Sequence, residues 1–93
     1  MYWTRDLSYT IVPKSGPMRK MQTLLDANRA MSKDLPFGYL RRRHWLTAGE
    51  AVVNAAETGT EKDIKIATDG LLNALEAEGW MTRAPRPDGE LGN

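Results

Sequence analysis

A single segment of this 93-residue chain carries side chains that suggest a chemical role: Arg41-Arg42-Arg43-His44-Trp45. Guanidinium groups bind phosphates, and a neighbouring aromatic ring offers a surface on which a base can stack. Arginine and aromatic residues are also the usual anchors of protein interfaces. We therefore predict a binding surface made of the arginine run with Tyr39 and Trp45.

The arginine run also has a purely structural interpretation. If a helix begins near Gly38, the arginines lie in its first two turns, where the helix dipole opposes them at a cost of about 0.3 to 1 kcal/mol each. Ion pairs with Glu76, Glu78 or Asp34 would offset that cost. Such pairs are a simpler explanation of the run than an anionic partner.

Catalytic motifs are absent from the sequence. His44 is the one histidine and cysteine is missing, so neither a multi-histidine metal site nor a thiol nucleophile can form. The carboxylates of Glu76 and Glu78, and of Glu61 and Asp63, stand two residues apart on a helix and point in different directions. No phosphate-binding or calcium-binding loop is present. We expect a noncatalytic domain without a metal or a cofactor.

Composition and length indicate one small globular domain. With 41% hydrophobic and 27% charged residues, the 93-residue chain resembles an average globular protein and is too short for two cores. We expect neither a signal peptide nor a membrane span, because the first residues hold no apolar core and no apolar run approaches about 18 residues. Together with the lack of cysteine, these features predict a cytoplasmic protein without a membrane contact.

Charge is sorted along the chain, although the net charge is only +1. Residues 1 to 46 hold nine Lys and Arg against three Asp, a net of +6, and residues 47 to 93 hold four against nine Asp and Glu, a net of −5. The simpler interpretation is that the two halves fold against each other. The alternative is a surface with a basic side and an acidic side, suited to an acidic partner or to self-association.

The N-terminal part of the chain predicts a β-hairpin. Apolar side chains alternate from about Asp6 to Val12, which indicates a strand, and residues 13 to 17 hold two prolines and a glycine, which indicate a turn. Residues 18 to 22 are expected to form the return strand, and a helix beginning at Pro17 is the alternative. The side chains expected to face the core are those of Leu7, Tyr9 and Ile11.

Three helices are predicted after the hairpin. The first runs from about Leu24 to Lys33, with Thr23 and Asp26 at its start and Pro36 after its end. The second runs from Gly38 to Glu57, or begins at Ala48 if the pattern Thr47-Ala48-Gly49-Glu50 is a capping box. Its predicted buried face comprises Trp45, Ala48, Ala51, Val52, Ala55 and Ala56.

The third helix is predicted over residues 61 to 78. Thr60 and Asp63 are its N-terminal capping candidates, and Gly79 is its C-terminal stop. Residues 82 to 93 hold no apolar period and are predicted to be disordered. The whole indicates an α+β domain over residues 1 to 81, with a two-stranded β-hairpin packed against three helices; an all-α fold is the alternative.

These patterns resemble a family of short alphaproteobacterial proteins of unknown function. The resemblance covers about residues 3 to 81 and rests on packing motifs, which in chain order are Trp3, Leu7 and Tyr9, Thr23, Asp26 and Ala27, Pro36, Ala48, Ala51, Ala55 and Gly59, Ala67, Leu71 and Ala74. It implies a small α+β domain and supports the hairpin. It implies no activity, cofactor or site residue, and the cysteine often present in the central helix of the family is replaced here by Val52.

The function predicted from the sequence is noncatalytic binding in a bacterial cytoplasm. We expect the partner to be another protein or a second copy of the chain, with Tyr39, Arg41, Arg42, Arg43 and Trp45 at the contact. Nucleic-acid binding through the Arg41 to Arg43 run is the alternative, and a membrane partner is not expected.

Overall fold

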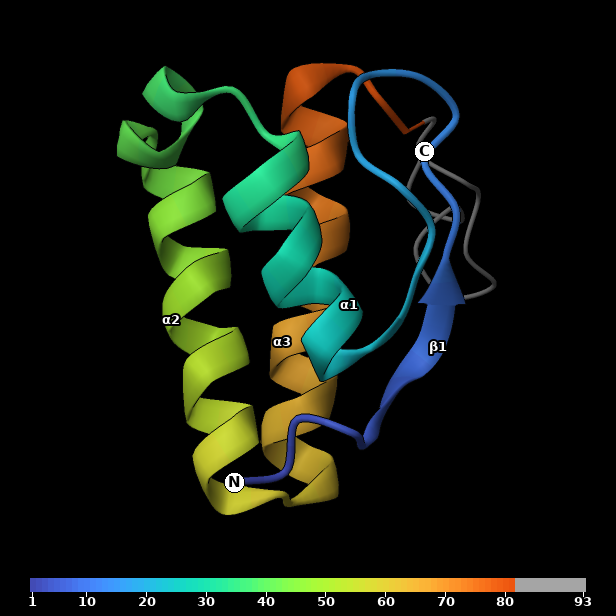
Figure 1. Cartoon of the computed structure of the whole chain (residues 1–93), viewed down its shortest axis with the longest axis vertical. Coiled ribbons are helices and arrows are strands. Elements are labelled where there is room, and N and C mark those ends of the chain that lie inside the picture. The colour runs from blue at the N-terminus through green and yellow to red at the C-terminus, as the bar shows by residue number, and fades with distance from the viewer. Residues whose placement is uncertain (82–93) are drawn as a thin grey trace, which may run out of the picture.

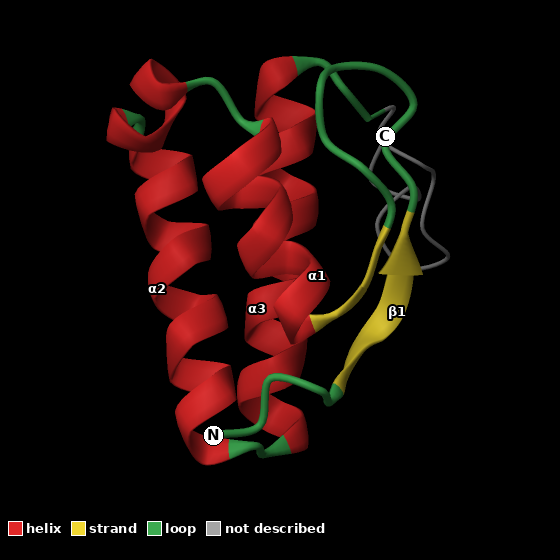
Figure 2. Ribbon diagram, in the orientation of Figure 1, coloured by secondary structure: helices red, strands yellow, loops and turns green. Residues whose placement is uncertain are grey.

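The computed structural model describes residues 1–81, which form three helices and a β-hairpin (Figures 1 and 2). The hairpin comprises β1 (Asp6–Ile11) and β2 (Met21–Thr23). It lies beside α1 (Leu24–Arg29) and α3 (Glu61–Glu78), on the side away from α2 (Arg43–Thr58). The predicted α+β class is confirmed for this part of the chain. The disorder predicted for residues 82 to 93 lies outside the described residues.

The hairpin is antiparallel and irregular. Asp6 pairs with Thr23 and Ile11 pairs with Met21, so the two strands advance by different numbers of residues between these pairs. The return strand, Met21–Thr23, is shorter than the predicted residues 18 to 22. The alternative of a helix starting at Pro17 is wrong, because residues 17 to 20 are not helical.

The alternation along β1 predicts its core side chains only in part. Leu7 and Ile11 are buried, whereas Tyr9 is 41% exposed. The Tyr9 hydroxyl donates a hydrogen bond to Asp69 Oδ1 on α3, with an oxygen–oxygen distance of 3.0 Å. The prediction that Tyr9 faces the core is wrong, because its polar end reaches a solvated carboxylate at the edge of α3.

The first helix begins as predicted and ends differently. Helix α1 (Leu24–Arg29) carries a capping box, in which Thr23 Oγ1 accepts from the Asp26 amide and the Asp26 carboxylate accepts from the Thr23 amide. After Arg29 the helix widens into a π-helical turn, η1 (Ala30–Asp34). Leu35 then adopts an extended conformation before Pro36, which is the stop that the sequence predicts.

Neither predicted start of the second helix is correct. A 3-10 helix, η2 (Phe37–Arg41), comes first, and α2 (Arg43–Thr58) follows after Arg42. The capping-box pattern at Thr47 therefore lies inside α2 and caps nothing. No side chain caps α2 by a local hydrogen bond, so its first turn needs another source of stabilisation.

Helices α2 and α3 (Glu61–Glu78) are antiparallel and form the centre of the core. Gly70 of α3 faces Ala48 of α2 closely enough that an added Cβ would lie 3.6 Å from the Ala48 Cα. The turn between the helices is built on Gly59, whose φ is +67°, and Thr60 caps α3 by accepting from the Asp63 amide. On the predicted face of α2, Ala48, Ala55 and Ala56 are buried, whereas Ala51 is only partly buried. Ala67 and Ala74 of α3 are buried as well.

Candidate functional site

The side chain of Glu78 organises the arginine-rich segment. Glu78 is the last residue of α3, its side chain is 6% exposed, and its two carboxylate oxygens are engaged at the start of α2. Oε1 accepts from Arg42 Nη1 at 2.7 Å. Oε2 lies 2.8 Å from His44 Nε2 and accepts from Trp45 Nε1 at 3.0 Å. We call these four residues, Arg42, His44, Trp45 and Glu78, the Glu78 cluster.

The Glu78 cluster explains how α2 can begin with basic residues. Because α2 and α3 are antiparallel, the carboxylate at the end of α3 lies beside the positive end of α2 and favours its dipole. Burial raises the pKa of the Glu78 carboxyl, but the hydrogen bonds from His44 and Trp45 and the positive charge of Arg42 outweigh burial and lower the pKa below its ordinary value. The ion pair predicted between the arginine run and Glu78 is confirmed for Arg42, whereas Asp34 pairs with Arg19 instead.

A stack of rings covers one side of this cluster. The Arg42 guanidinium lies 4.2 Å from the centre of the Tyr39 ring, close enough for a cation–π contact. The Tyr39 ring in turn lies 5.4 Å from that of Trp80, which follows α3, and the Trp80 ring lies 6.2 Å from that of Trp45. The side chains of Tyr39 and Arg42 therefore already make contacts within the molecule.

The five predicted contact residues have different surroundings. Trp45 is fully buried, so the prediction that it contacts a partner is wrong: its indole packs in the core and its N–H group is used by Glu78. Arg41 lies 6.0 Å from the centre of the Phe37 ring, which is 80% exposed. Arg43 is exposed and forms no ion pair with another residue of the described part of the chain.

The imidazole and the carboxylate of the Glu78 cluster are two of the three groups that a catalytic triad requires, but the third is not beside them. Within residues 1–81, no hydroxyl is hydrogen-bonded to His44. The same residues contain no cluster of three His, Asp or Glu side chains that could hold a metal ion. The contacts of Glu78 can orient Arg42, His44 and Trp45 at the start of α2.

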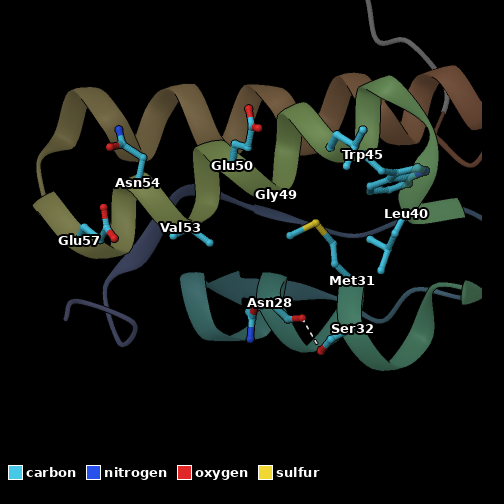
Figure 3. Close-up of a pocket in the computed structure, with 11 residues that line it drawn as sticks. Asn28, Met31, Ser32, Leu40, Trp45, Gly49, Glu50, Val53, Asn54 and Glu57 are labelled. Carbon is cyan, nitrogen blue, oxygen red and sulfur yellow. Dashed lines mark hydrogen bonds between the residues drawn. The ribbon is translucent and has the colours of Figure 1, made fainter.

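The surface feature that the sequence analysis missed is a groove of about 590 Å³ between α1–η1 and α2 (Figure 3). Apolar side chains from η1, η2 and α2 line it: Met31, Leu40, Trp45, Leu46 and Val53. The polar lining consists of Asn28, Ser32, Glu50, Asn54 and Glu57. Figure 3 shows Met31 and Val53 pointing toward each other across the opening, and Glu50 pointing away from α1.

Two exposed apolar residues of α2 border this groove. Leu46 is 54% exposed and Val53 is 42% exposed, and they stand seven residues apart, so they lie on the same side of the helix. This spacing is visible in the sequence and could have indicated a second apolar face of α2 besides the alanine face. Leu40 and Leu46 flank the arginine run, which therefore lies near one end of the groove.

Comparison with protein-family models, with curated proteins and with solved structures found no match to this chain. The resemblance to the alphaproteobacterial family accordingly stays a prediction. Among residues 1–81, no helix combines the length and the apolar character that crossing a bilayer requires.

Proposed function

We propose that this chain is a noncatalytic protein-binding domain, and that its contact surface is the groove between α1–η1 and α2. The observation that carries the proposal is the pair of exposed apolar side chains, Leu46 and Val53, beside an opening lined mainly by carbon atoms. Exposed apolar surface bordered by polar side chains is typical of protein interaction sites. An amphipathic helix fits such a groove with anchors one heptad apart.

The predicted contact residues Tyr39, Arg41, Arg42 and Arg43 fit this proposal as a rim near one end of the groove. Arg43 and the exposed Phe37 are the members of this region with the most freedom to meet a partner. Arg42 is held by Glu78 and Tyr39, so it supports the contact mainly by fixing the start of α2. The lack of cysteine supports a cytoplasmic location for the domain.

Nucleic-acid binding through the Arg41 to Arg43 run has weaker support. The run does not act as three free cations, because Glu78 neutralises Arg42, and the Tyr39 ring already contacts Arg42 and Trp80. If nucleic acid were nevertheless the ligand, its affinity would fall steeply with salt, and replacing Arg43 with Ala would flatten that dependence. Absence of binding to generic DNA and RNA at low salt would eliminate this alternative.

Site-specific photocrosslinking tests the proposed groove. A photoreactive amino acid replaces Asn54, which lines the groove, and a control replaces Ile66, which is 52% exposed on α3. In the native cell, we expect protein adducts at position 54 that disappear when Leu46→Lys is added, and few adducts at position 66. Equal adducts at both positions, or none at position 54, would contradict the proposal.

A further inference from the structure

We infer that the groove is covered by a second copy of this chain, with α2 of one copy antiparallel to α2 of the other. This inference rests on the proposed function, because it names the partner of the same groove. It starts from the order of side chains along the exposed edge of α2, which we call the α2 edge: Arg43, Leu46, Glu50, Val53 and Glu57.

The α2 edge has the spacing of a helix that pairs with another helix. Its members follow at intervals of three, four, three and four residues, which is the heptad pattern, and all of them are exposed. The buried alanines lie on a different side of α2 and face α3. Helix α2 therefore has two faces suited to helix packing, and within the described residues only one of them is covered.

An antiparallel arrangement matches the apolar members of the α2 edge. A two-fold axis beside Gly49 and Glu50 brings Leu46 of one copy opposite Val53 of the second copy, and the reverse. Leu46 and Val53 are about 10 Å apart along the helix, so both contacts form together. Outside the backbone of α2 itself, no atom of the described residues lies within 4 Å of where a Gly49 Cβ would be, which leaves room for close approach at the centre.

Charge selects the antiparallel direction. The same axis brings Arg43 of one copy opposite Glu57 of the second copy, whereas a parallel pair would bring like charges together at both ends. Neither Arg43 nor Glu57 has an ion-pair partner elsewhere in residues 1–81. The α2 edge thus carries at its two ends the opposite charges that a self-complementary contact requires.

Glu50 makes the register testable. In this arrangement the two Glu50 side chains stand nearest the axis, on the outer flank of the groove, because Glu50 points away from α1 (Figure 3). Two carboxylates near one axis repel each other, so they should weaken the pair and leave it sensitive to their charge. Replacing Glu50 with Gln is expected to strengthen association.

Two facing grooves would form one shared core. In each copy α1–η1, η2 and α2 supply one half, in which Met31 and Leu40 are less exposed than Leu46 and Val53. Pairing the halves gives four helices around the apolar side chains, an arrangement in which short amphipathic helices commonly bury such surface. The second copy completes a site that one chain leaves open.

Sedimentation equilibrium of the full chain over about 1 μM to 1 mM tests the inference. We expect the mass to rise with concentration from 10.4 kDa toward twice that value. Val53→Glu should weaken association about tenfold or more. The control Ile66→Glu, at a β-branched residue on α3 that is 52% exposed against 42% for Val53, should leave it unchanged. A monomer at every concentration, or equal effects of both variants, would overturn the inference.

The register has its own test. Arg43→Glu and Glu57→Arg should each weaken association several-fold, and the double variant should recover most of the loss. Because the chain has no cysteine, Glu50→Cys supplies a unique thiol, and mild oxidation should link it into a dimer faster than the exposed control Lys62→Cys. No recovery in the double variant, together with equal oxidation rates, would overturn the antiparallel arrangement. Circular dichroism establishes that each variant is folded.

Failure of this inference can be told apart from failure of the proposed function. Adducts at position 54 that have twice the mass of the chain agree with self-association. Adducts with a different protein, together with a monomer in sedimentation, overturn the second copy as partner and leave the groove as the binding surface. No adduct at position 54 overturns both.

Discussion

At the scale of single residues, Glu78 is the side chain on which the start of α2 depends. Its carboxylate accepts hydrogen bonds from Arg42 and from the buried indole of Trp45, and it faces His44. We expect Glu78→Gln to lower the free energy of unfolding by about 1 to 3 kcal/mol, because charged hydrogen bonds to a largely buried group are lost. Urea unfolding of this variant and of the exposed control Glu61→Gln measures the difference; equal losses would contradict the role assigned to Glu78.

Glu78 also predicts a pH dependence of stability. Because the pKa of the carboxyl is lowered in the folded state, its contribution is present above the ordinary pKa of about 4.5 and is lost as pH falls through the folded pKa. The free energy of unfolding should therefore decline below about pH 5, and the Glu78→Gln variant should decline less steeply. Unfolding curves at pH 3, 4, 5 and 7 compare the two slopes, and identical slopes would show that Glu78 contributes nothing to the acid transition.

Trp45 shows which feature of the sequence predicts whether a side chain is buried or exposed. Its helical spacing with Ala48, Val52 and Ala55 predicts burial, whereas the preference of tryptophan for interfaces predicts a partner contact. Spacing gives the correct answer, because the side chain of a helical residue points where the helix turns it. The preference for interfaces only describes residues that already lie at the surface.

At the scale of elements, the helix ends that depend on neighbouring residues are predictable and the others are not. The Thr23 capping box, the Thr60 cap and the Gly79 stop involve residues within four positions of one another, and all are confirmed. The start of α2 depends on Glu78, which is 36 residues from Arg42, so no local pattern marks it. The π-helical turn Ala30–Asp34 has no local signal either.

The turn between α2 and α3 depends on Gly59 in two ways. Its φ of +67° suits glycine, and an added Cβ would lie 2.6 Å from the ring of Tyr2. Gly79 has a φ of +79°, but beyond its own helix and chain neighbours no atom of residues 1–81 lies within 4 Å of such a Cβ. We expect Gly79→Ala to cost about 1 kcal/mol from backbone strain, and Gly59→Ala to cost more.

Thermal unfolding of the two glycine variants separates strain from steric conflict. Tyr2→Ala added to Gly59→Ala should bring its loss toward that of Gly79→Ala, because the ring that an added methyl group meets is then removed. If Gly59→Ala and Gly79→Ala are equally stable from the outset, Tyr2 does not restrict this turn.

At the scale of the whole molecule, folding pairs the basic first half of the chain with the acidic second half only in part. Arg42 and Glu78 join the basic and acidic halves, whereas Arg19 pairs with Asp34 inside the first half and Lys65 pairs with Asp69 inside the second. The fold class followed from periodicity and turn residues. The groove did not, because it lies between α1–η1 and α2, and its shape depends on how these elements pack against each other.

The open groove predicts that the stability of the whole molecule depends on its concentration. If two copies cover each other's grooves, unfolding also requires their separation, so mass action raises the Tm as protein concentration increases. Calorimetry from about 10 μM to 1 mM should show this rise for the wild type and for Ile66→Glu, and a smaller rise for Val53→Glu. A Tm that rises equally in all three proteins would mean that the copies associate through another surface. A constant Tm in the wild type would mean that the folded chain does not associate with itself over this range.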